Sequence, residues 1–268
     1  KVVVDRFSDR VKHWVTINEP QCFIGLGYRD GLHAPGMTLS FKECLMAGHN
    51  APLAHGRSVQ VIREHAKQTP IIGWSSSGAV YRPATVSRDD ISAAREATSA
   101  IYSDNVWNTR WWSDPAILGH YPEEGLKAYQ QALPSFPASD FEIIQQPLDY
   151  YACNIFQVST VRMSEEGTPV AVPLIEGEEI TLYEWTQHSD SLYWGPRFIH
   201  ELYDLPLVIT QNGCSTLDRV SLDGAVHDSN RTDFIIGHLL ALQRAMDEEV
   251  DVRGYFHWSL LDNFEWQE

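Results

Sequence analysis

The sequence of 268 residues has little positive charge and no long hydrophobic run. Its 20 Lys and Arg against 36 Asp and Glu give a formal net charge of −16, which repels nucleic acids and anionic membranes. No apolar stretch approaches the roughly 18 residues of a membrane span, and the amino terminus shows no signal-peptide pattern. We therefore expect no nucleic-acid partner, no membrane partner and a cytoplasmic location. A single Asn-Arg-Thr sequon for N-glycosylation at 230–232 argues against a cytoplasmic location, although such triplets are often accidental.

Cysteines are few, and no metal-binding motif is present. The four cysteines are scattered and form no Cys-x-x-Cys pair, which argues against a zinc or redox site. His49 and His55 lie six residues apart in an expected helix, so they do not share a face. We expect reduced cysteines, no metal and no cofactor.

Short β-rich runs alternate with longer amphipathic stretches, and no Ser/Gly-rich linker or internal repeat interrupts them. This alternation is typical of βα units around a parallel sheet in one domain. The expected strands are His13 to Asn18, Ile71 to Ser75, Leu148 to Ile155, Leu207 to Thr210 and Val252 to Trp258. The expected helices are Ser40 to Ala66, Asp89 to Asn108, Ser191 to Leu202 and Arg231 to Glu248.

Two of the expected strands end in similar polar clusters. Residues 14–20 read Trp-Val-Thr-Ile-Asn-Glu-Pro and residues 207–213 read Leu-Val-Ile-Thr-Gln-Asn-Gly. Glu19 is the carboxylate of the first cluster, and Gln211 stands in the second where the pattern calls for a carboxylate. The two strand ends therefore present a carboxyl-type pair.

The chain resembles the retaining β-glycosidases of glycoside hydrolase family 1, in which Asn-Glu-Pro carries the acid/base and Thr-Glu-Asn-Gly carries the nucleophile. Further matching motifs occur in the same order along the chain: Asp-Arg-Val-Lys at 9–12, Trp-Ser-Asp-Pro at 112–115, Gly-His-Tyr-Pro at 119–122, residues 149–156, and the run from 254 to 266. The resemblance implies an α/β fold of the (β/α)8 TIM-barrel type, with this chain supplying about strands 4 to 8.

By the same resemblance, residues 1–268 are a partial catalytic barrel that lacks the first three βα units and the last helix. A five-stranded open sheet would leave an unpaired apolar edge, so we expect a complementary barrel fragment as partner or an engineered split. A smaller open α/β fold is the alternative.

The resemblance assigns the catalytic roles to Glu19 and Gln211. In a retaining glycosidase two carboxylates about 5 to 5.5 Å apart act as acid/base and nucleophile. Glu19 is the expected acid/base. Gln211 occupies the nucleophile position but carries no negative charge, so we expect severely reduced activity. The isosteric change favours deliberate substitution over natural loss.

The substrate-binding residues follow from the same motifs. Asn18 and Asn154 resemble the residues that hold the hydroxyl beside the anomeric carbon. Three residues resemble the site for the non-reducing sugar: Trp258, Glu265 and Trp266. A carboxylate at this place would repel a phosphate, which favours an unphosphorylated sugar.

Two further positions are less certain. Trp185 resembles an aromatic residue of the aglycone site. Phe156 stands where the family usually has a tyrosine that touches the nucleophile; a shifted alignment would give that role to Tyr150 or Tyr151.

The expected function is that of an exo-acting β-glycosidase, specifically a β-glucosidase that hydrolyses unphosphorylated β-glucosides or cello-oligosaccharides by double displacement. The alternative is a non-catalytic sugar or protein receptor built on the same domain. A thioglucosidase fits less well, because that branch replaces the acid/base and keeps the nucleophile.

Overall fold

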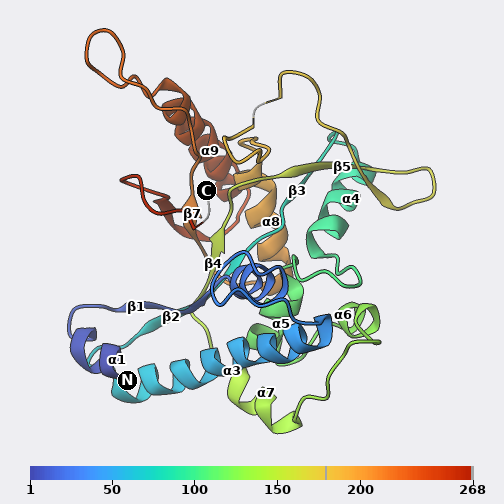
Figure 1. The fold of residues 1–268 in the computed structure, drawn as a ribbon, viewed down its shortest axis with the longest axis vertical. Helices are drawn as coiled ribbons and strands as arrows, with labels where there is room; N and C mark the ends of the chain where they lie inside the picture. The colour runs from blue at the N-terminus through green and yellow to red at the C-terminus, as the bar shows by residue number, and fades with distance from the viewer. Residues whose placement is uncertain (179, 267–268) are drawn as a thin grey trace. The chain divides into compact units, whose positions relative to one another are not determined.

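The computed structural model describes residues 1–178 and 180–266. The chain forms two compact units, which comprise Lys1–Ser77 with Ser99–Ala152, and Gly78–Thr98 with Cys153–Trp266. The main sheet has the strand order β1-β2-β4-β7-β8 (Figure 1). Strand β4 (Tyr150–Asn154) is buried along its whole length and runs from the first unit into the second.

The first unit holds strands β1 and β2 and most of the helices. β1 and β2 are parallel, with His13 opposite Ile71. Their bounds and those of the helices are β1 (His13–Asn18), β2 (Ile71–Ser77), α1 (Val2–Phe7), α2 (Pro20–Cys22), the π-helix η1 (Phe23–Arg29), α3 (Phe41–His65), α5 (Arg110–Leu118), α6 (Glu123–Ala128) and α7 (Ala138–Ile144).

The long helix α3 provides the core of this unit. It begins at a capping box, in which the Ser40 hydroxyl accepts from the Glu43 N–H and the Glu43 carboxylate accepts from the Ser40 N–H. Val59 and Ile62 of α3 pack against Ile72 of β2 in a fully buried cluster. These contacts bury the apolar side chains of α3 and β2 and hold α3 on the strands.

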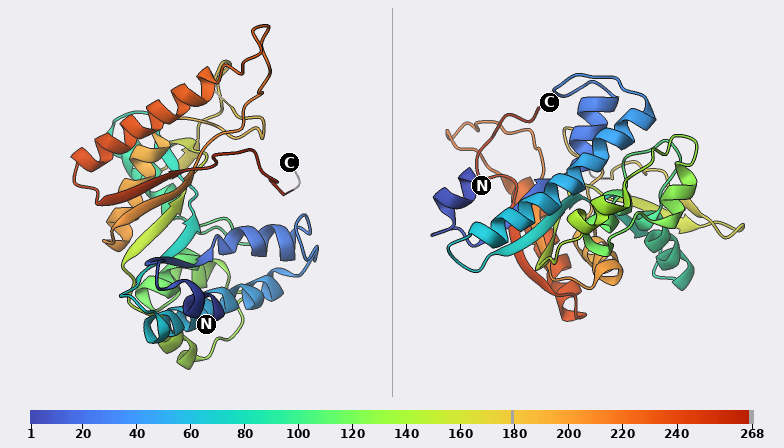
Figure 2. Two further views of the ribbon diagram at one scale, coloured as in Figure 1. Left: turned by 90° about the vertical axis from the view of Figure 1, so that its left-hand side faces the viewer. Right: turned by 90° about the horizontal axis from the view of Figure 1, so that it is seen from below.

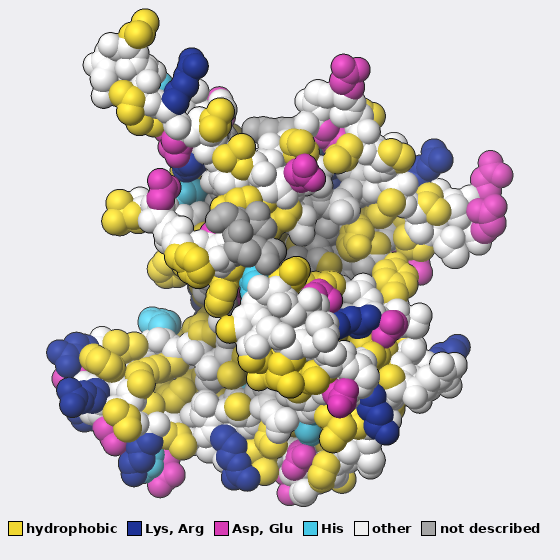
Figure 3. Space-filling model, in the orientation of Figure 1, with side chains coloured by type: hydrophobic (Ala, Val, Ile, Leu, Met, Phe, Trp, Pro, Cys, Tyr) yellow, Lys and Arg dark blue, Asp and Glu magenta, His cyan; other side chains and the backbone are white. Residues whose placement is uncertain are grey.

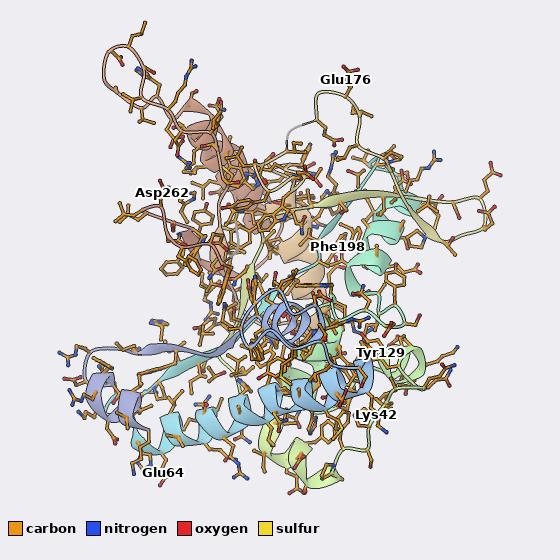
Figure 4. The ribbon with its side chains drawn as sticks, in the orientation of Figure 1. Lys42, Glu64, Tyr129, Glu176, Phe198 and Asp262 are labelled. Carbon is orange, nitrogen blue, oxygen red and sulfur yellow. The ribbon has the colours of Figure 1, made fainter. Side chains whose placement is uncertain are left out.

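The second unit holds the end of β4, the parallel strands β7 and β8, and a small second sheet. β7 pairs with β8 with Leu207 opposite Val252. Helices α8 and α9 lie side by side (Figure 2), with Phe198 of α8, labelled in Figure 4, buried in the unit. The bounds are β3 (Tyr81–Pro83), α4 (Arg88–Ser99), β5 (Ser159–Met163), β6 (Pro169–Ala171), α8 (Ser191–Tyr203), β7 (Leu207–Asn212), α9 (Ser229–Asp247) and β8 (Val252–His257).

The five predicted strands are confirmed as β1, β2, β4, β7 and β8, and three of the predicted helices as α3, α8 and α9. The fourth helix prediction, Asp89 to Asn108, was wrong in its second half, because α4 ends at Ser99. Beyond it, the side chain of Asn105 accepts from the Trp107 N–H, and that of Asn108 accepts from the Trp111 N–H. Asparagine side chains that bond nearby backbone in this way compete with helical hydrogen bonds.

The small sheet β3-β5-β6 was not predicted. β5 is parallel to β3 and antiparallel to β6, and two of its strands have only three residues. Asp90 of α4 fastens the sheet, because its carboxylate accepts from the Thr85 hydroxyl (2.6 Å) and from the Met163 N–H (2.9 Å).

Hydrophobic side chains are numerous on the surface (Figure 3). They include Val15 on β1, 38% exposed, and Phe256 on β8, 60% exposed, and these strands stand at the two ends of the strand order. The two end strands of the sheet thus each carry an exposed apolar side chain. Within the described residues, the helices are all too short or too polar to cross a membrane.

Candidate active site

Glu19 lies where β1 ends and α2 begins. Its backbone is left-handed, with φ 48° and ψ 65°, and Pro20 takes the first position of α2, where proline is well tolerated. The Glu19 N–H donates to the carbonyl of Ser75 on β2, at 3.2 Å. A non-glycine residue in this conformation costs on the order of 1 to 3 kcal/mol and is found most often at functional sites. The half-buried Glu19 is therefore held in a strained but anchored position.

Asn18 is hydrogen-bonded to the same residue, Ser75. Its side-chain oxygen accepts a hydrogen bond from the Ser75 hydroxyl at 2.9 Å. The first unit thus brings two of the predicted site residues, Asn18 and Glu19, together at one strand end.

Gln21 and Cys22 of α2 follow Glu19 closely, and the sequence analysis did not single them out. Gln21 is buried, and its Nε2 donates to the Ser76 hydroxyl (2.8 Å) and the Ser77 carbonyl (2.6 Å). Burial, followed by the negative charge of Glu19, raises the pKa of the Cys22 thiol, so this thiol stays protonated at neutral pH. Their position directly after Glu19 was the only signal in the sequence.

Gln211 and Asn154 are brought together in the second unit. The backbone N–H of Ile155 donates to the Gln211 carbonyl at 2.9 Å, and the Thr210 hydroxyl donates to the Asn154 side-chain oxygen at 2.6 Å. Asn154 is buried, whereas the Gln211 side chain is half-buried. Strands β4 and β7 therefore place the predicted nucleophile position beside one of the predicted sugar-binding residues.

Trp258 is hydrogen-bonded to the last residue of β7. Its N–H donates to the carbonyl of Asn212 at 2.9 Å. A Cβ on Gly213 would lie 1.8 Å from the Trp258 carbonyl oxygen, so only glycine permits this close approach. The Trp258 indole is 40% exposed, which leaves part of its surface open to a ligand.

Phe156 and Trp185 are also neighbours. Their ring centroids are 5.8 Å apart, and Tyr183 meets Trp185 edge-on at 5.4 Å. The Thr181 hydroxyl accepts from the N–H groups of Tyr183 and Trp185, which fixes the tight turn that carries them. The structure thus links Trp185 to the strand end of β4 and adds Tyr183, which the sequence analysis did not single out.

The alternative assignment to Tyr150 or Tyr151 is not favoured. The Tyr150 hydroxyl donates to the Trp14 carbonyl at 3.0 Å. The Tyr151 hydroxyl lies 3.0 Å from that of Ser113. Both hydroxyls are hydrogen-bonded to residues of the first unit, and the assignment of Phe156 to this position stays a prediction.

Glu265 and Trp266 lie beyond β8 in a segment without regular structure, where Figure 4 labels Asp262. Within this segment the Ser259 hydroxyl donates to the Leu261 carbonyl, and the Asn263 amide donates to the Ser259 hydroxyl. Glu265 is half-buried and Trp266 is 59% exposed. Their role in sugar binding stays a prediction.

The first unit carries a carboxyl and an amide side chain at the end of β1, and the second unit carries amide and aromatic side chains at the ends of β4, β7 and β8. In the part of the chain that the structure describes, no cluster of His, Cys, Asp and Glu has the arrangement of a metal site. These groups suit proton transfer and the binding of a neutral polyhydroxylated ligand.

Comparisons with known proteins agree with the motifs. The family model of glycosyl hydrolase family 1 matches residues 1–268. Beta-glucosidase A of Thermotoga maritima is 35% identical over 270 residues, which cover 100% of this chain and 58% of the relative. A 1,4-beta-D-glucan glucohydrolase of Thermotoga neapolitana is also 35% identical, over 100% of this chain and 61% of the relative.

Solved structures give the same result. The Thermotoga maritima family 1 β-glucosidase in complex with isofagomine lactam superposes with a TM-score of 0.83 at 34% identity, over 99% of this chain and 58% of that chain. Its complex with glucoimidazole gives a TM-score of 0.84 with the same coverage. The chain thus spans about 58% of these relatives, and its sheet corresponds to about strands 4 to 8 of a (β/α)8 barrel. The chain belongs to glycosyl hydrolase family 1.

Proposed function

We propose that this chain is part of a retaining, exo-acting β-glucosidase whose nucleophile glutamate is replaced by Gln211. The observation that carries the proposal is the placement of Gln211, hydrogen-bonded through its carbonyl to Ile155 beside Asn154, in a chain of this family. An amide of glutamate size fits this position without the charge that attack on a sugar requires.

The proposed reaction is double displacement. Glu19 protonates the glycosidic oxygen while a glutamate at position 211 attacks the anomeric carbon and forms an ester. Glu19 then removes a proton from water, which hydrolyses the ester with net retention. With Gln211 the first step lacks its anionic nucleophile, and we expect hydrolysis to fall by several orders of magnitude, about 10⁴-fold or more.

The proposed substrates are unphosphorylated β-glucosides and cello-oligosaccharides. The indoles of Trp258 and Trp266 suit the apolar faces of a pyranose, and Glu265 suits two adjacent hydroxyls. Asn18 and Asn154 would hold the hydroxyl beside the anomeric carbon. The named relatives, a beta-glucosidase and a 1,4-beta-D-glucan glucohydrolase, support this substrate class.

Because the chain spans 58% and 61% of those two relatives, we propose that activity requires the remaining barrel strands, in the same polypeptide or in a complementary fragment. A suitable test protein is this chain fused to the segment of Thermotoga maritima beta-glucosidase A that it does not cover, called the completed barrel below. A cytoplasmic location stays a prediction from the sequence.

The test is hydrolysis of an aryl β-glucoside by the completed barrel with Gln211→Glu. We expect hydrolysis by this revertant and almost none by the Gln211 protein. Gln130→Glu, at an exposed position, is the matched control for adding one negative charge and should leave the Gln211 protein inactive. A folded revertant without activity would contradict the proposal and favour a non-catalytic receptor.

A further inference from the structure

Asn212, the residue after Gln211, is fully buried, and its side chain joins two neighbouring strands. Its Nδ2 donates to the Ile155 carbonyl at 2.8 Å, and its Oδ1 accepts from the Tyr255 hydroxyl at 3.0 Å. Both ends of the amide are used, so its orientation is determined: a flip would set two oxygens, those of Asn212 and Ile155, against each other. One side chain thus connects the ends of β4, β7 and β8.

The backbone around Asn212 is irregular at the same place. The register between β7 and β8 shifts between Ile209 and Asn212, and such irregularities in a sheet often re-aim a side chain beside an active site. Pairing resumes with Asn212 opposite His257, and the Asn212 side-chain amide adds hydrogen bonds to both neighbouring strands.

Two of the predicted site residues are connected directly to Asn212. Residue 211 precedes Asn212 directly, and the Trp258 N–H donates to the Asn212 carbonyl at 2.9 Å. A movement of Asn212 would therefore shift the nucleophile position and Trp258 relative to each other.

We propose that Asn212 and Tyr255 are positioning residues, which hold the nucleophile at position 211 in register with a sugar ring stacked on Trp258. The proposal rests on the proposed glycosidase function. A carboxylate oxygen of residue 211 bonds to the anomeric carbon of that ring while the glycosidic C–O bond breaks, and the leaving oxygen takes its proton from Glu19. A misplacement of 1 Å between reacting groups can lower a rate by about 100-fold. The hydrogen bonds of Asn212 and Tyr255 therefore affect the rate of the chemical step.

The test uses the completed barrel with Gln211→Glu as parent, and compares Tyr255→Phe and Asn212→Ala. The measurements are kcat and KM for an aryl β-glucoside, the rate constant of inactivation by a dinitrophenyl 2-deoxy-2-fluoro-β-glucoside, whose leaving group needs no proton, and the melting temperature. The inactivation reports attack by residue 211 alone. We expect Tyr255→Phe to lower kcat and the inactivation rate constant about tenfold and Asn212→Ala about 100-fold, with KM changed less than kcat.

A double variant separates positioning from general loss of stability. If Tyr255 acts through Asn212, the two substitutions together should reduce the inactivation rate no further than Asn212→Ala alone. Fully multiplicative effects would overturn the proposal.

Tyr121→Phe is the matched control, because the Tyr121 hydroxyl is also buried and lies 2.8 Å from Nδ1 of His49, in the first unit. It should lower the melting temperature and leave kcat unchanged. Loss of kcat in Tyr255→Phe no greater than in this control would overturn the positioning role, while activity of the parent would still support the glycosidase. An inactive parent would overturn both.

Discussion

The backbone N–H of Ile155 donates to the backbone carbonyl of Gln211 at 2.9 Å. This bond joins the end of β4 to the end of β7 and places Phe156, the next residue, on the same edge of the sheet. Phe156 in turn meets the Trp185 ring at 5.8 Å between centroids. By the family resemblance Phe156 replaces a tyrosine that touches the nucleophile, so we expect its ring to lie near residue 211.

This relationship predicts a gain of function. In the completed barrel with Gln211→Glu, Phe156→Tyr should raise the rate of glycosyl-enzyme formation by up to about tenfold, or about 1.4 kcal/mol, since a phenolic hydroxyl that donates to the carboxylate can hold it in the orientation for attack. The measurement is the rate of inactivation by a 2-deoxy-2-fluoro-β-glucoside. The same change beside Gln211 should bring no gain, and an unchanged rate in the revertant would rule out this contact.

Glu19 should matter most for substrates with poor leaving groups. Glu19→Gln in the revertant removes the proton donor, so hydrolysis of an alkyl β-glucoside should fall by about 10² to 10⁴-fold. Formation of the glycosyl-enzyme from a dinitrophenyl β-glucoside, whose leaving group needs no proton, should change far less. Pre-steady-state burst kinetics separate the two steps. Equal losses for both substrates would argue against an acid role.

The packing of α7 on α3 requires glycine at position 56. A Cβ there would lie 1.9 Å from the Ile143 carbonyl oxygen, a backbone atom that cannot move aside alone. Gly56→Ala should therefore lower the free energy of unfolding by about 2 kcal/mol or more. Urea unfolding of the completed barrel measures the change.

Gly237 in α9 is the matched control. A Cβ at this position would meet Ser189 at 3.4 Å, an ordinary contact, and alanine is favoured in a helix interior. Gly237→Ala should raise the free energy of unfolding by about 0.5 to 1 kcal/mol. Equal effects of the two substitutions would contradict the packing described for α7.

His55 should make the fold sensitive to acid. Burial lowers the pKa of His55 from 6.5 to about 4, so the imidazole is neutral in the folded state and takes up a proton more readily in the unfolded state. The free energy of unfolding contributed by this group is present above pH 6.5 and declines as the pH falls from about 6.5 to 4, by about 3 kcal/mol in total.

The check is urea unfolding across this pH range. His55→Gln should reduce the decline, whereas His227→Gln, at an exposed position, should retain it. Parallel curves for His55→Gln and the parent would show that His55 is not the source of the acid sensitivity.

Much of the fold could be predicted because its signals are local. Each strand of the main sheet is a short β-rich run that ends in polar or turn-forming residues, and α3 begins at a hydroxyl cap. The helix expected to reach Asn108 failed because the side chains of Asn105 and Asn108 bond to the backbone, which a helical pattern of apolar residues does not reveal.

The sequence by itself determined the family, the order of the strands along the chain, and Glu19 and Gln211 as the residues at two strand ends. Only the tertiary structure decided which groups hold those ends: the Ser75 carbonyl for Glu19, the Ser75 hydroxyl for Asn18, and the Tyr255 hydroxyl for Asn212. Asn212 and Tyr255 are 43 positions apart and meet because β7 and β8 pair in parallel. Such contacts depend on which strands pair and in which register. The apolar periodicity of the sequence indicates only that the strands exist.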